Sequence, residues 1–354
     1  MTQGPIELLD PTDSADSTRR DALLSAGTSL VDTYDEQLAE LAQIRDPASL
    51  GSTPKPLADN PGERLVFYPW RNSLVRVVGP DAYRELRTNR NRELLTHEEQ
   101  ERFASAHIGF AGLNVGNPGA VCIALEGGSS RMKLADLDPL SLTNLNRFRA
   151  GLPDLGVNKA TLTARQVLEI DPYYELELYD AGIAPATIES FMTEPHIDLL
   201  VEEMDALPLK VLVREAAKTA RIPVIMVTGN GEGVLLDVER YDLEPDLAIL
   251  NGLLGNSIRD QSLSPEVMKL SLRERAHLAR DFMGKSFLDS RLLDSFEAFG
   301  RSLVGIPQLA ESSFLRGAAL CYAAKAIILK RPLPSGRYTF SFSGHLILVP
   351  SQIP

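Results

Sequence analysis

The stretch that decides the fold reads HIGFAGLNVGNPGAVCIALEGGSSRMKLADLDPLSLTNLNRFRAGLPDLGVNK and runs from His107 to Lys159. An apolar run ends at a turn broken by glycines, a short helix follows, and a second strand, RMKLA, leads into Asp136 and Asp138. A polar series closes the stretch. This order of strand, glycine turn, helix, strand and acidic residues predicts the first half of a nucleotide-binding α/β domain.

Strand and helix patterns keep alternating beyond this stretch. Helices are expected at 158–171, 184–192 and 207–221, and strands at 174–179, 197–203 and 224–229. The strand IDLLVEE is apolar almost throughout, which is typical of a strand buried on both faces of a parallel sheet. The alternation predicts an α/β fold: a Rossmann-like, mainly parallel sheet with right-handed crossovers and helices on both faces.

The two ends of the chain have other patterns. At the N-terminus we expect a helix over 18–44, a Pro-, Gly- and Ser-rich linker over 46–63 and two β-rich pieces in RLVFYPWRNSLVRVVG. At the C-terminus, residues 265–330 read as mostly helical, and RYTFSFSGHLILV alternates like a hairpin or edge strands. The predicted division is residues 1–17 disordered, 18–88 an N-terminal α+β extension, 89–345 the main domain and 346–354 a tail.

Composition restricts the function. The formal net charge of -12 disfavours nonspecific nucleic-acid binding, which needs a basic face. No apolar run reaches the roughly 18 residues needed to span a bilayer, and no signal-peptide pattern opens the chain, so we predict a cytoplasmic protein. Only Cys122 and Cys321 are present, which excludes a disulfide framework and a four-cysteine zinc site; we expect both to be buried packing residues.

Some side chains have two interpretations. Trp70 is either a ligand-stacking residue or an aromatic anchor that docks the extension onto the main domain. The histidines show no metal-ligand spacing, and we expect structural roles for all five: His97, His107, His196, His277 and His345.

The glycine turn is the first candidate binding feature. Gly112, Gly116 and Gly119 follow the first strand, with Asn117 as a possible helix N-cap and Pro118 at the first helical position. Such a turn lets backbone N–H groups and the helix dipole meet phosphate oxygens. Tight packing of strand against helix, without a ligand, explains the same glycines.

The second candidate binding feature is the acidic pair Asp136 and Asp138. Asp136 lies at the end of the second strand, about 20 residues past the glycine turn, where a carboxylate accepts hydrogen bonds from a ribose hydroxyl. An aspartate pair before Pro139 also suits a turn or a helix cap.

Further motifs make the interpretation specific. The run D-L-D, then N-L-N-R at 144–147 and G-V-N-K at 156–159, resembles the ThiF/MoeB family of ubiquitin-activating-type adenylyltransferases. R-E-L-L at 92–95, Asp171-Pro172 and V-T-G at 227–229 are also similar to family motifs, and the resemblance extends from about Asn89 to Phe342. It implies an ATP-binding, nucleotidyl-transferring enzyme.

The resemblance assigns roles by position. Asp136 would bind the ribose of ATP, and Asn144, Arg147 and Lys159 would contact its phosphates. The two cations would offset the charge that builds as a carboxylate attacks a phosphate. Further ATP contacts would come from the turn and the acidic pair: Gly112, Asn114, Gly116 and Asp138.

Two other residues complete the expected catalytic set. Arg92 matches an arginine that reaches the γ-phosphate in the neighbouring subunit of family dimers, which implies a homodimer with shared sites. Asp205 matches a carboxylate that helps to hold Mg²⁺, and Glu202 stands where a second aspartate is common. The predicted catalytic residues are therefore Arg92, Arg147, Lys159 and Asp205.

The chain also departs from the family pattern. Asn114 and Val115 occupy positions of two family glycines, which leaves a nonadenylating member as an alternative unless the turn is re-formed around Gly116. No cysteine lies between Cys122 and Cys321, and no C-x-x-C zinc pair is present. We therefore expect neither an enzyme thioester nor a structural zinc.

These observations predict an adenylyltransferase that uses Mg-ATP to activate a carboxylate as an acyl adenylate. The expected target is the C-terminus of a ubiquitin-like carrier protein or peptide. One alternative is a small or tRNA-linked carboxylate, and another is a nonadenylating scaffold that binds a nucleotide or a partner.

Overall fold

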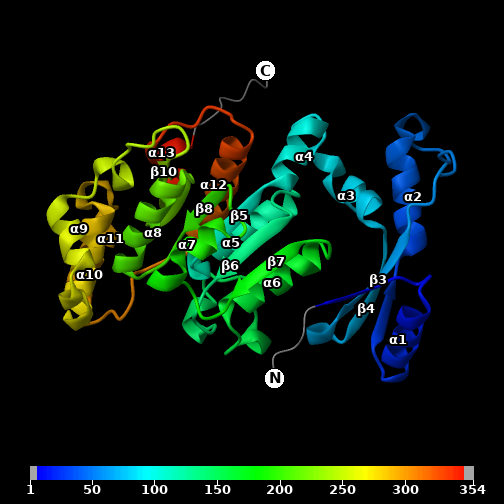
Figure 1. Cartoon of the computed structure of the whole chain (residues 1–354), viewed down its shortest axis with the longest axis horizontal. Coiled ribbons are helices and arrows are strands. Elements are labelled where there is room, and N and C mark those ends of the chain that lie inside the picture. The colour runs from blue at the N-terminus through cyan, green and yellow to red at the C-terminus, as the bar shows by residue number, and fades with distance from the viewer. Residues whose placement is uncertain (1–5, 347–354) are drawn as a thin grey trace, which may run out of the picture. The chain divides into compact units, whose positions relative to one another are not determined.

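The computed structural model describes residues 6–346 and divides into two compact units (Figure 1). Unit 1 comprises the chain up to Glu101 together with Leu168–Tyr174, and unit 2 comprises Arg102–Val167 and the chain from Glu175 onward. The predicted boundary at residue 89 thus lies inside unit 1. Nearly all of the predicted tail, 346–354, falls outside the described residues, as do residues 1–5.

Unit 1 contains a four-stranded sheet with the strand order β1-β3-β4-β2. Its strands are β1 (Glu7–Leu9), β2 (Ser29–Asp32), β3 (Glu63–Tyr68) and β4 (Ser73–Val78), and its helices are α1 (Ser14–Ser25), α2 (Tyr34–Arg45) and α3 (Pro80–Thr88), followed by α4 (His97–Ser105), which continues into unit 2. β3 and β4 form an antiparallel hairpin whose turn contains Pro69, as the two predicted β-rich pieces require.

Two N-terminal predictions are wrong. Residues 1–17 are ordered where the structure describes them, because β1 pairs with β3 and α1 starts at Ser14. The single helix expected over 18–44 is split: Gly27, at a φ of 87°, follows the end of α1, and β2 then pairs in parallel with β4. Leu30 and Val31 are therefore strand residues, although their spacing fits a helix.

Residues 168–174 complete the packing of unit 1. The hydroxyl of Tyr68 donates to the Leu168 carbonyl at 3.0 Å, and that of Tyr83 donates to the Ile170 carbonyl at 2.7 Å. The indole of Trp70 packs edge-on against Tyr68 and donates to the Glu169 carboxylate. Trp70 is therefore held by packing and hydrogen bonding within unit 1.

Unit 2 is built on a seven-stranded sheet with the strand order β11-β10-β9-β8-β5-β6-β7. Its strands are β5 (His107–Ala111), β6 (Arg131–Ala135), β7 (Glu175–Tyr179), β8 (Leu199–Glu202), β9 (Val224–Asn230), β10 (Gly233–Glu239) and β11 (Gly336–Ser341). The five strands β9, β8, β5, β6 and β7 are parallel to one another. β10 is antiparallel to both of its neighbours, β9 and the edge strand β11. This mainly parallel sheet confirms the predicted fold class.

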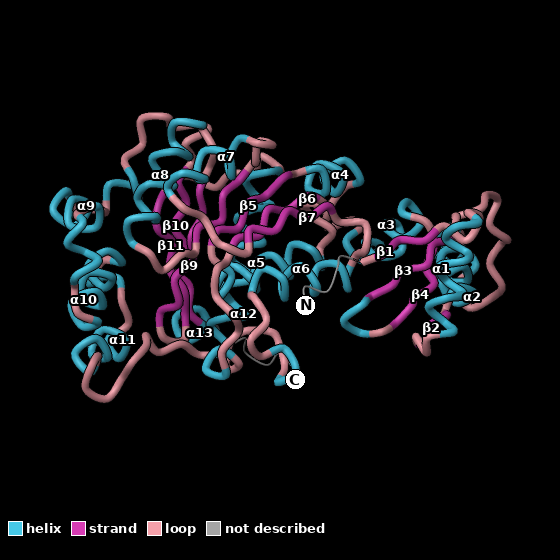
Figure 2. The backbone as a smooth tube through the Cα atoms, turned by 60° about the horizontal axis from the view of Figure 1, so that its bottom comes forward, coloured by secondary structure: helices cyan, strands magenta, loops and turns pink. Residues whose placement is uncertain are grey.

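The helices of unit 2 flank the sheet or pack against neighbouring helical segments. They are α5 (Leu113–Leu125), α6 (Lys159–Ile170), α7 (Ile188–Thr193), α8 (Leu207–Ala220), α9 (Asn256–Leu263), α10 (Leu272–Met283), α11 (Ser290–Ser295), α12 (Ala310–Ile328) and α13 (Phe342–His345). α5 lies alongside α12, and α7 packs with α8 (Figure 2). Between residues 6 and 346, no helix is long and apolar enough to cross a membrane.

Close packing of α5 and α12 depends on small residues. A Cβ atom on Gly317 would lie 2.7 Å from the Pro118 carbonyl oxygen, so only glycine allows this approach. The two cysteines lie in the same interface, where the Cys122 thiol hydrogen-bonds with Cys321. Cys321 is buried and Cys122 half-buried, which confirms that both pack between helices.

We predict that Gly317→Ala destabilises unit 2 through this interface. Its Cβ would overlap backbone atoms, whereas in the control Gly116→Ala the new atom is 3.7 Å from the nearest neighbour, an ordinary contact. Overpacking costs about 1–3 kcal/mol, and we expect this difference between the variants in their free energies of unfolding by urea. Equal stabilities would contradict the packing argument.

Candidate functional site

The candidate site lies at the carboxyl ends of the parallel strands in unit 2. Strand order reverses between β5 and β8, because β6 and β7 continue on one side of β5 and β8 and β9 on the other. Ligands of open α/β sheets bind at such a reversal, outside the carboxyl ends of the strands.

The turn after β5 is reduced to one residue. Gly112 has a φ of 92° and is the N-cap of α5, and a Cβ atom there would lie 2.5 Å from the backbone of Glu203. Because α5 starts at Leu113, the prediction of Asn117 as N-cap with Pro118 at the first helical position is wrong. Asn117 instead lies inside the helix, where its amide donates to Thr163 and Gln166.

The remaining residues of the predicted glycine turn, from Asn114 to Gly119, lie within helix α5. Gly119 meets Leu320 of α12, so packing explains it, while Gly116 has ordinary space around it. The side-chain oxygen of Asn114 is buried and has no hydrogen-bond partner in the described part of the chain. Val115 lines a small cavity beside the sheet. Only Gly112 therefore needs the backbone freedom of glycine.

Asp136 caps α5. One carboxylate oxygen accepts the Leu113 N–H at 2.7 Å, and the other accepts the Asp138 N–H at 2.8 Å. Only 8% of the residue is exposed, and burial raises its pKa although both N–H groups oppose that shift. A carboxylate has about four lone pairs, so acceptor capacity remains for a ribose hydroxyl.

The Asn-Arg-Lys series folds back onto this edge. Lys159 opens α6 with 4% of its surface exposed, and its ammonium lies 3.1 Å from the carboxylate of the exposed Asp138. Asn144 is buried and accepts the Ser141 N–H at 3.0 Å, which closes the turn before Arg147. The structure thus brings Asp138 and Lys159 together and gives Asn144 a role in shaping the loop.

The guanidinium of Arg147 has hydrogen-bond acceptors for only some of its N–H groups among the described residues. Its Nη1 donates to the Thr143 carbonyl at 2.9 Å and to the Asn146 side chain at 2.8 Å, whereas its Nε is buried without a partner among the described residues. Burial lowers the pKa of Arg147, and the nearby Asp205 carboxylate opposes the shift. Arg147 and Asp205, although 58 positions apart in the sequence, therefore lie close enough for their charges to interact.

Two further arginines, Arg149 and Arg316, which have no counterpart in the sequence prediction, have charges that interact with each other, and Arg316 also interacts with Arg147. Arg316, on α12, is 2% exposed, and Arg149 lies with its guanidinium 4.1 Å from the ring centre of Phe314. The signal for Arg316 was present in the sequence, because it interrupts the apolar helix SFLRGAALCYAAKAIILK. A charged residue in such a helix needs a specific environment.

Arg316 lines a cavity of about 120 Å³ at the ends of β8 and β9. Apolar side chains from α10 and neighbouring segments form much of its wall: Leu207, Met226, Phe282, Met283 and Ile306. Its polar lining includes Glu203, Asp205 and Gln308. Glu203 is buried, which raises its pKa well above the ordinary value, and it accepts the Val227 N–H at 2.6 Å.

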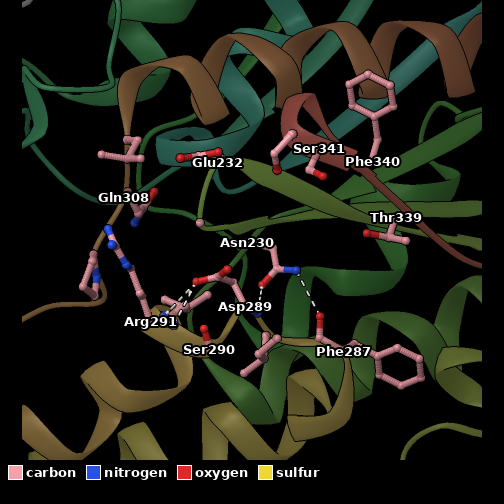
Figure 3. Close-up of a pocket in the computed structure, with 17 residues that line it drawn as sticks. Asn230, Glu232, Phe287, Asp289, Ser290, Arg291, Gln308, Thr339, Phe340 and Ser341 are labelled. Atoms are coloured by element: carbon pink, nitrogen blue, oxygen red, sulfur yellow. Dashed lines mark hydrogen bonds between the residues drawn. The ribbon is translucent and has the colours of Figure 1, made fainter. Parts of the chain in front are cut away.

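A larger cavity, of about 610 Å³, lies beyond the β9–β10 turn (Figure 3). It is lined by that turn, by β11 and by the start of α11, and Asn230 bridges the Phe287 carbonyl and the Asp289 N–H. Gln308 lines both cavities, so they adjoin at this residue.

Glu202 is engaged in the core. It is fully buried and pairs with Arg214 and, at 3.1 Å, with Lys210, while Arg214 also pairs with Glu239 at 2.8 Å. Burial by itself raises the pKa of Glu202, but Lys210 and Arg214 outweigh burial and hold the pKa below its ordinary value. Although Glu202 stands at a position of the family's metal motif, its carboxylate is occupied by Lys210 and Arg214 and is not free to bind a metal ion.

The carboxylates fit magnesium only in part. Asp205 is exposed at the edge, and Mg²⁺ is commonly held by one or two carboxylates together with substrate phosphates. No group of three His, Cys, Asp or Glu side chains able to hold a metal ion occurs within the described residues. Any Mg²⁺ site would thus rest on Asp205 and the nucleotide.

Arg92 lies in unit 1. It follows the turn Asn89–Asn91 and lines a cavity of about 890 Å³ that Arg84 and Glu101 also line. The expected role of Arg92 in a neighbouring subunit stays a prediction.

Fold and site together define a Rossmann-like α/β protein with cationic side chains at the carboxyl edge of its sheet. Residues 87–242 match the ThiF family, so this part of the chain is a ThiF family domain, as its motifs predict.

Relatives extend beyond this domain. The chain is 34% identical over 318 residues to the uncharacterized protein MT1398 of Mycobacterium tuberculosis, which covers 89% of this chain and 42% of that protein. It is 27% identical over 159 residues to the tRNA threonylcarbamoyladenosine dehydratase of Escherichia coli, covering 44% of this chain and 58% of the relative. The chain thus spans about half the length of these relatives.

Among solved structures, the chain is similar to that E. coli dehydratase, TcdA, in complex with ATP. The TM-score is 0.48 at 19% identity, and the match covers 70% of this chain and 95% of the other.

We predict that substitutions at two neighbouring carboxylates affect different properties, stability at Glu202 and Mg-ATP binding at Asp205. Glu202→Gln should lower the free energy of unfolding by about 3–5 kcal/mol, because it leaves Arg214 and Lys210 without full compensation in the core. Asp205→Asn should leave the stability unchanged and weaken Mg-ATP binding. Denaturant unfolding and calorimetric titration separate the two, and a stable Glu202→Gln protein that fails to bind Mg-ATP would contradict the assignment.

The stabilising effect of Glu202 also predicts a pH dependence. Because its folded pKa lies below the unfolded value, its contribution is present at neutral pH and is lost as the pH falls through the folded pKa. The stability difference between wild type and Glu202→Gln should therefore shrink in acid.

Proposed function

We propose that the carboxyl edge of unit 2 binds ATP and transfers its adenylyl group to a carboxylate. One observation carries the proposal: residues of the family's motifs lie together there, with Lys159 3.1 Å from Asp138 and a partly unpaired Arg147 whose charge interacts with that of Asp205. Positive charge that is half-buried and incompletely paired is suited to an anionic ligand.

Each residue has a defined role in this proposal. Asp136, already fixed by two N–H groups, would accept a ribose hydroxyl, and the first turn of α5 would face the phosphates. Arg147 and Lys159 would bind phosphate oxygens, with Asn144 holding the loop in place. Magnesium, on Asp205 and the phosphates, would supply further positive charge.

The chemistry is a displacement at the α-phosphorus. A carboxylate oxygen forms a bond to phosphorus, the bond to the bridging oxygen of the β-phosphate breaks, and pyrophosphate leaves with that electron pair. Two anions must approach each other, so Arg147 and Lys159 would lower the barrier by offsetting charge that increases in the transition state. The product is an acyl adenylate.

The substrate in this proposal is the C-terminus of a ubiquitin-like carrier or peptide. The small cavity would hold the reacting end, and the larger cavity, which adjoins it at Gln308, has space for preceding residues. Because Cys122 and Cys321 pack between α5 and α12, the acyl adenylate would pass directly to a nucleophile without an enzyme thioester. A cytoplasmic location and the absence of a structural zinc remain predictions.

A tRNA-linked or small carboxylate is the second candidate. The similarity to the E. coli tRNA threonylcarbamoyladenosine dehydratase favours it, while the net charge of -12 argues against an RNA substrate. Titration with tRNA in the presence of ATP distinguishes the two candidates, since only a tRNA-linked carboxylate substrate predicts specific tRNA binding.

Calorimetric titration with Mg-ATP tests the nucleotide site, and mass spectrometry of products tests the transfer. With ATP and peptide or protein fractions, the proposal expects pyrophosphate release and an adenylated carboxyl species. No nucleotide binding would favour a nonadenylating scaffold, for which Asn114 and Val115 at family glycine positions are the rationale.

We predict that Lys159→Met weakens ATP binding by about 10–100-fold, as expected for loss of a hydrogen bond to a charged group. The affinity for AMP, which lacks the β- and γ-phosphates, should fall less than the affinity for ATP. Lys218→Met is the control, because this lysine donates to the Leu247 carbonyl at the far end of α8. Unchanged ATP affinity in a folded Lys159→Met protein would contradict the phosphate role.

We also predict that Arg92→Ala loses its preference for ATP over ADP, since the proposed partner arginine contacts only the γ-phosphate. Arg84→Ala is the matched control, because both arginines line one cavity. Affinities for both nucleotides, with sedimentation to measure the oligomeric state, provide the test. A dimer that keeps its full ATP preference without Arg92 would refute the shared site.

A further inference from the structure

Arg316 is a buried cation of unit 2 whose hydrogen bonding is incomplete. Its Nη1 donates to the Gln308 side-chain oxygen at 2.9 Å, but its Nε and Nη2 are buried without a partner among the residues that the structure describes. Only 2% of the residue is exposed. Burying a charge without a compensating anion costs several kcal/mol, on the order of the stability of a domain.

The core shows what a structural arginine looks like in this protein. Arg214 is equally buried, and the two carboxylates Glu202 and Glu239 neutralise it. Burial opposes the charged form there too, yet the carboxylates raise the pKa of Arg214. Arg316 has no ion pair of this kind within residues 6–346, so its charge is not explained by packing alone.

One carboxylate and two arginines act on the charge of Arg316. Burial lowers its pKa to about 10, Glu203 opposes the shift, and Arg147 and Arg149 lower it further. Glu203 already accepts the Val227 N–H at 2.6 Å. Arg316 thus stays charged at neutral pH while its neighbours add positive charge.

The cavity beside Arg316 has space for a ligand end. At about 120 Å³ it is below the roughly 300–1,000 Å³ of common small-molecule pockets, so it would hold only a terminal group. Its wall is mostly apolar near Phe282 and Ile306, and its polar lining includes Asp205 and Gln308. A group with an apolar stem and an anionic tip fits this division.

We propose that Arg316 and Gln308 bind an oxyanion in this cavity, an interaction that lies outside the ThiF motifs. This inference rests on the proposed function and deepens it, since the oxyanion is either the carboxylate to be activated or a phosphate of ATP. The guanidinium presents a planar fork that matches both groups. Arg316 would then position the reacting anion next to Arg147.

The test uses Arg316→Gln in the full chain, with ATP, AMP and acetate as probes. Lys325→Gln is the control, because it removes a cation of α12 that pairs with Glu126 instead. If Arg316 holds a phosphate, the affinities for ATP and AMP fall at least 10-fold. If it holds a carboxylate, nucleotide affinities stay within twofold and acetate binding, measured by ¹³C NMR, is lost.

A second variant keeps the proposal falsifiable if Arg316→Gln fails to fold. Gln308→Glu places a carboxylate next to Nη1, so it should raise the melting temperature and weaken binding of the same probe at least 10-fold. A merely structural arginine predicts the stabilisation without the loss of affinity.

Three results decide the matter. Unchanged binding of ATP, AMP and acetate in both variants overturns the role of Arg316. Wild-type protein that binds acetate through Arg316 but no nucleotide supports this inference and refutes the proposed function. Loss of ATP or acetate binding in both variants, with Lys325→Gln unaffected, supports the inference.

Discussion

Incompletely compensated positive charge at the carboxyl edge of the unit 2 sheet is the constraint on which the site depends. Arg147, Arg149 and Arg316 each bury at least one N–H group that has no acceptor in the portion of the chain that is described. Elsewhere in the same unit, Arg214 is matched by two carboxylates. Partly unpaired cations of this kind support the proposal that the edge binds an anion.

The backbone explains why these cations meet. Gly112 and Asp136 together start α5 directly after β5, which shortens the glycine turn and places Val115 against the small cavity. Asn146 donates to the Gln308 carbonyl, so the loop that bears Arg147 is tied to the segment before α12. The strand ends, the loop and α12 thereby converge on one edge.

Local sequence patterns predicted much of this arrangement. Alternating apolar strands and amphipathic helices indicated the parallel sheet, because that periodicity reflects burial on both faces. The acidic pair and the Asn-Arg-Lys series lie at the edge where parallel strands end, as their spacing requires.

Contacts between distant residues were not predictable in this way. Asn117 and Pro118 fit a helix start, but the cap is provided by Gly112 and Asp136 from outside the local sequence. Glu202 matches a metal-ligand position, yet Arg214 and Lys210 engage it in the core. The surroundings of Arg316 are not predictable from local sequence, because they include Gln308 and a cavity formed by several segments.

Hydrogen–deuterium exchange of the wild-type chain with and without Mg-ATP tests the central claim most directly. The proposed site predicts slower exchange with ATP in peptides that cover 111–117 and 136–160, and little change across the unit 1 sheet. Unchanged exchange in both peptides at saturating ATP, or protection confined to unit 1, would contradict a nucleotide site at the carboxyl edge.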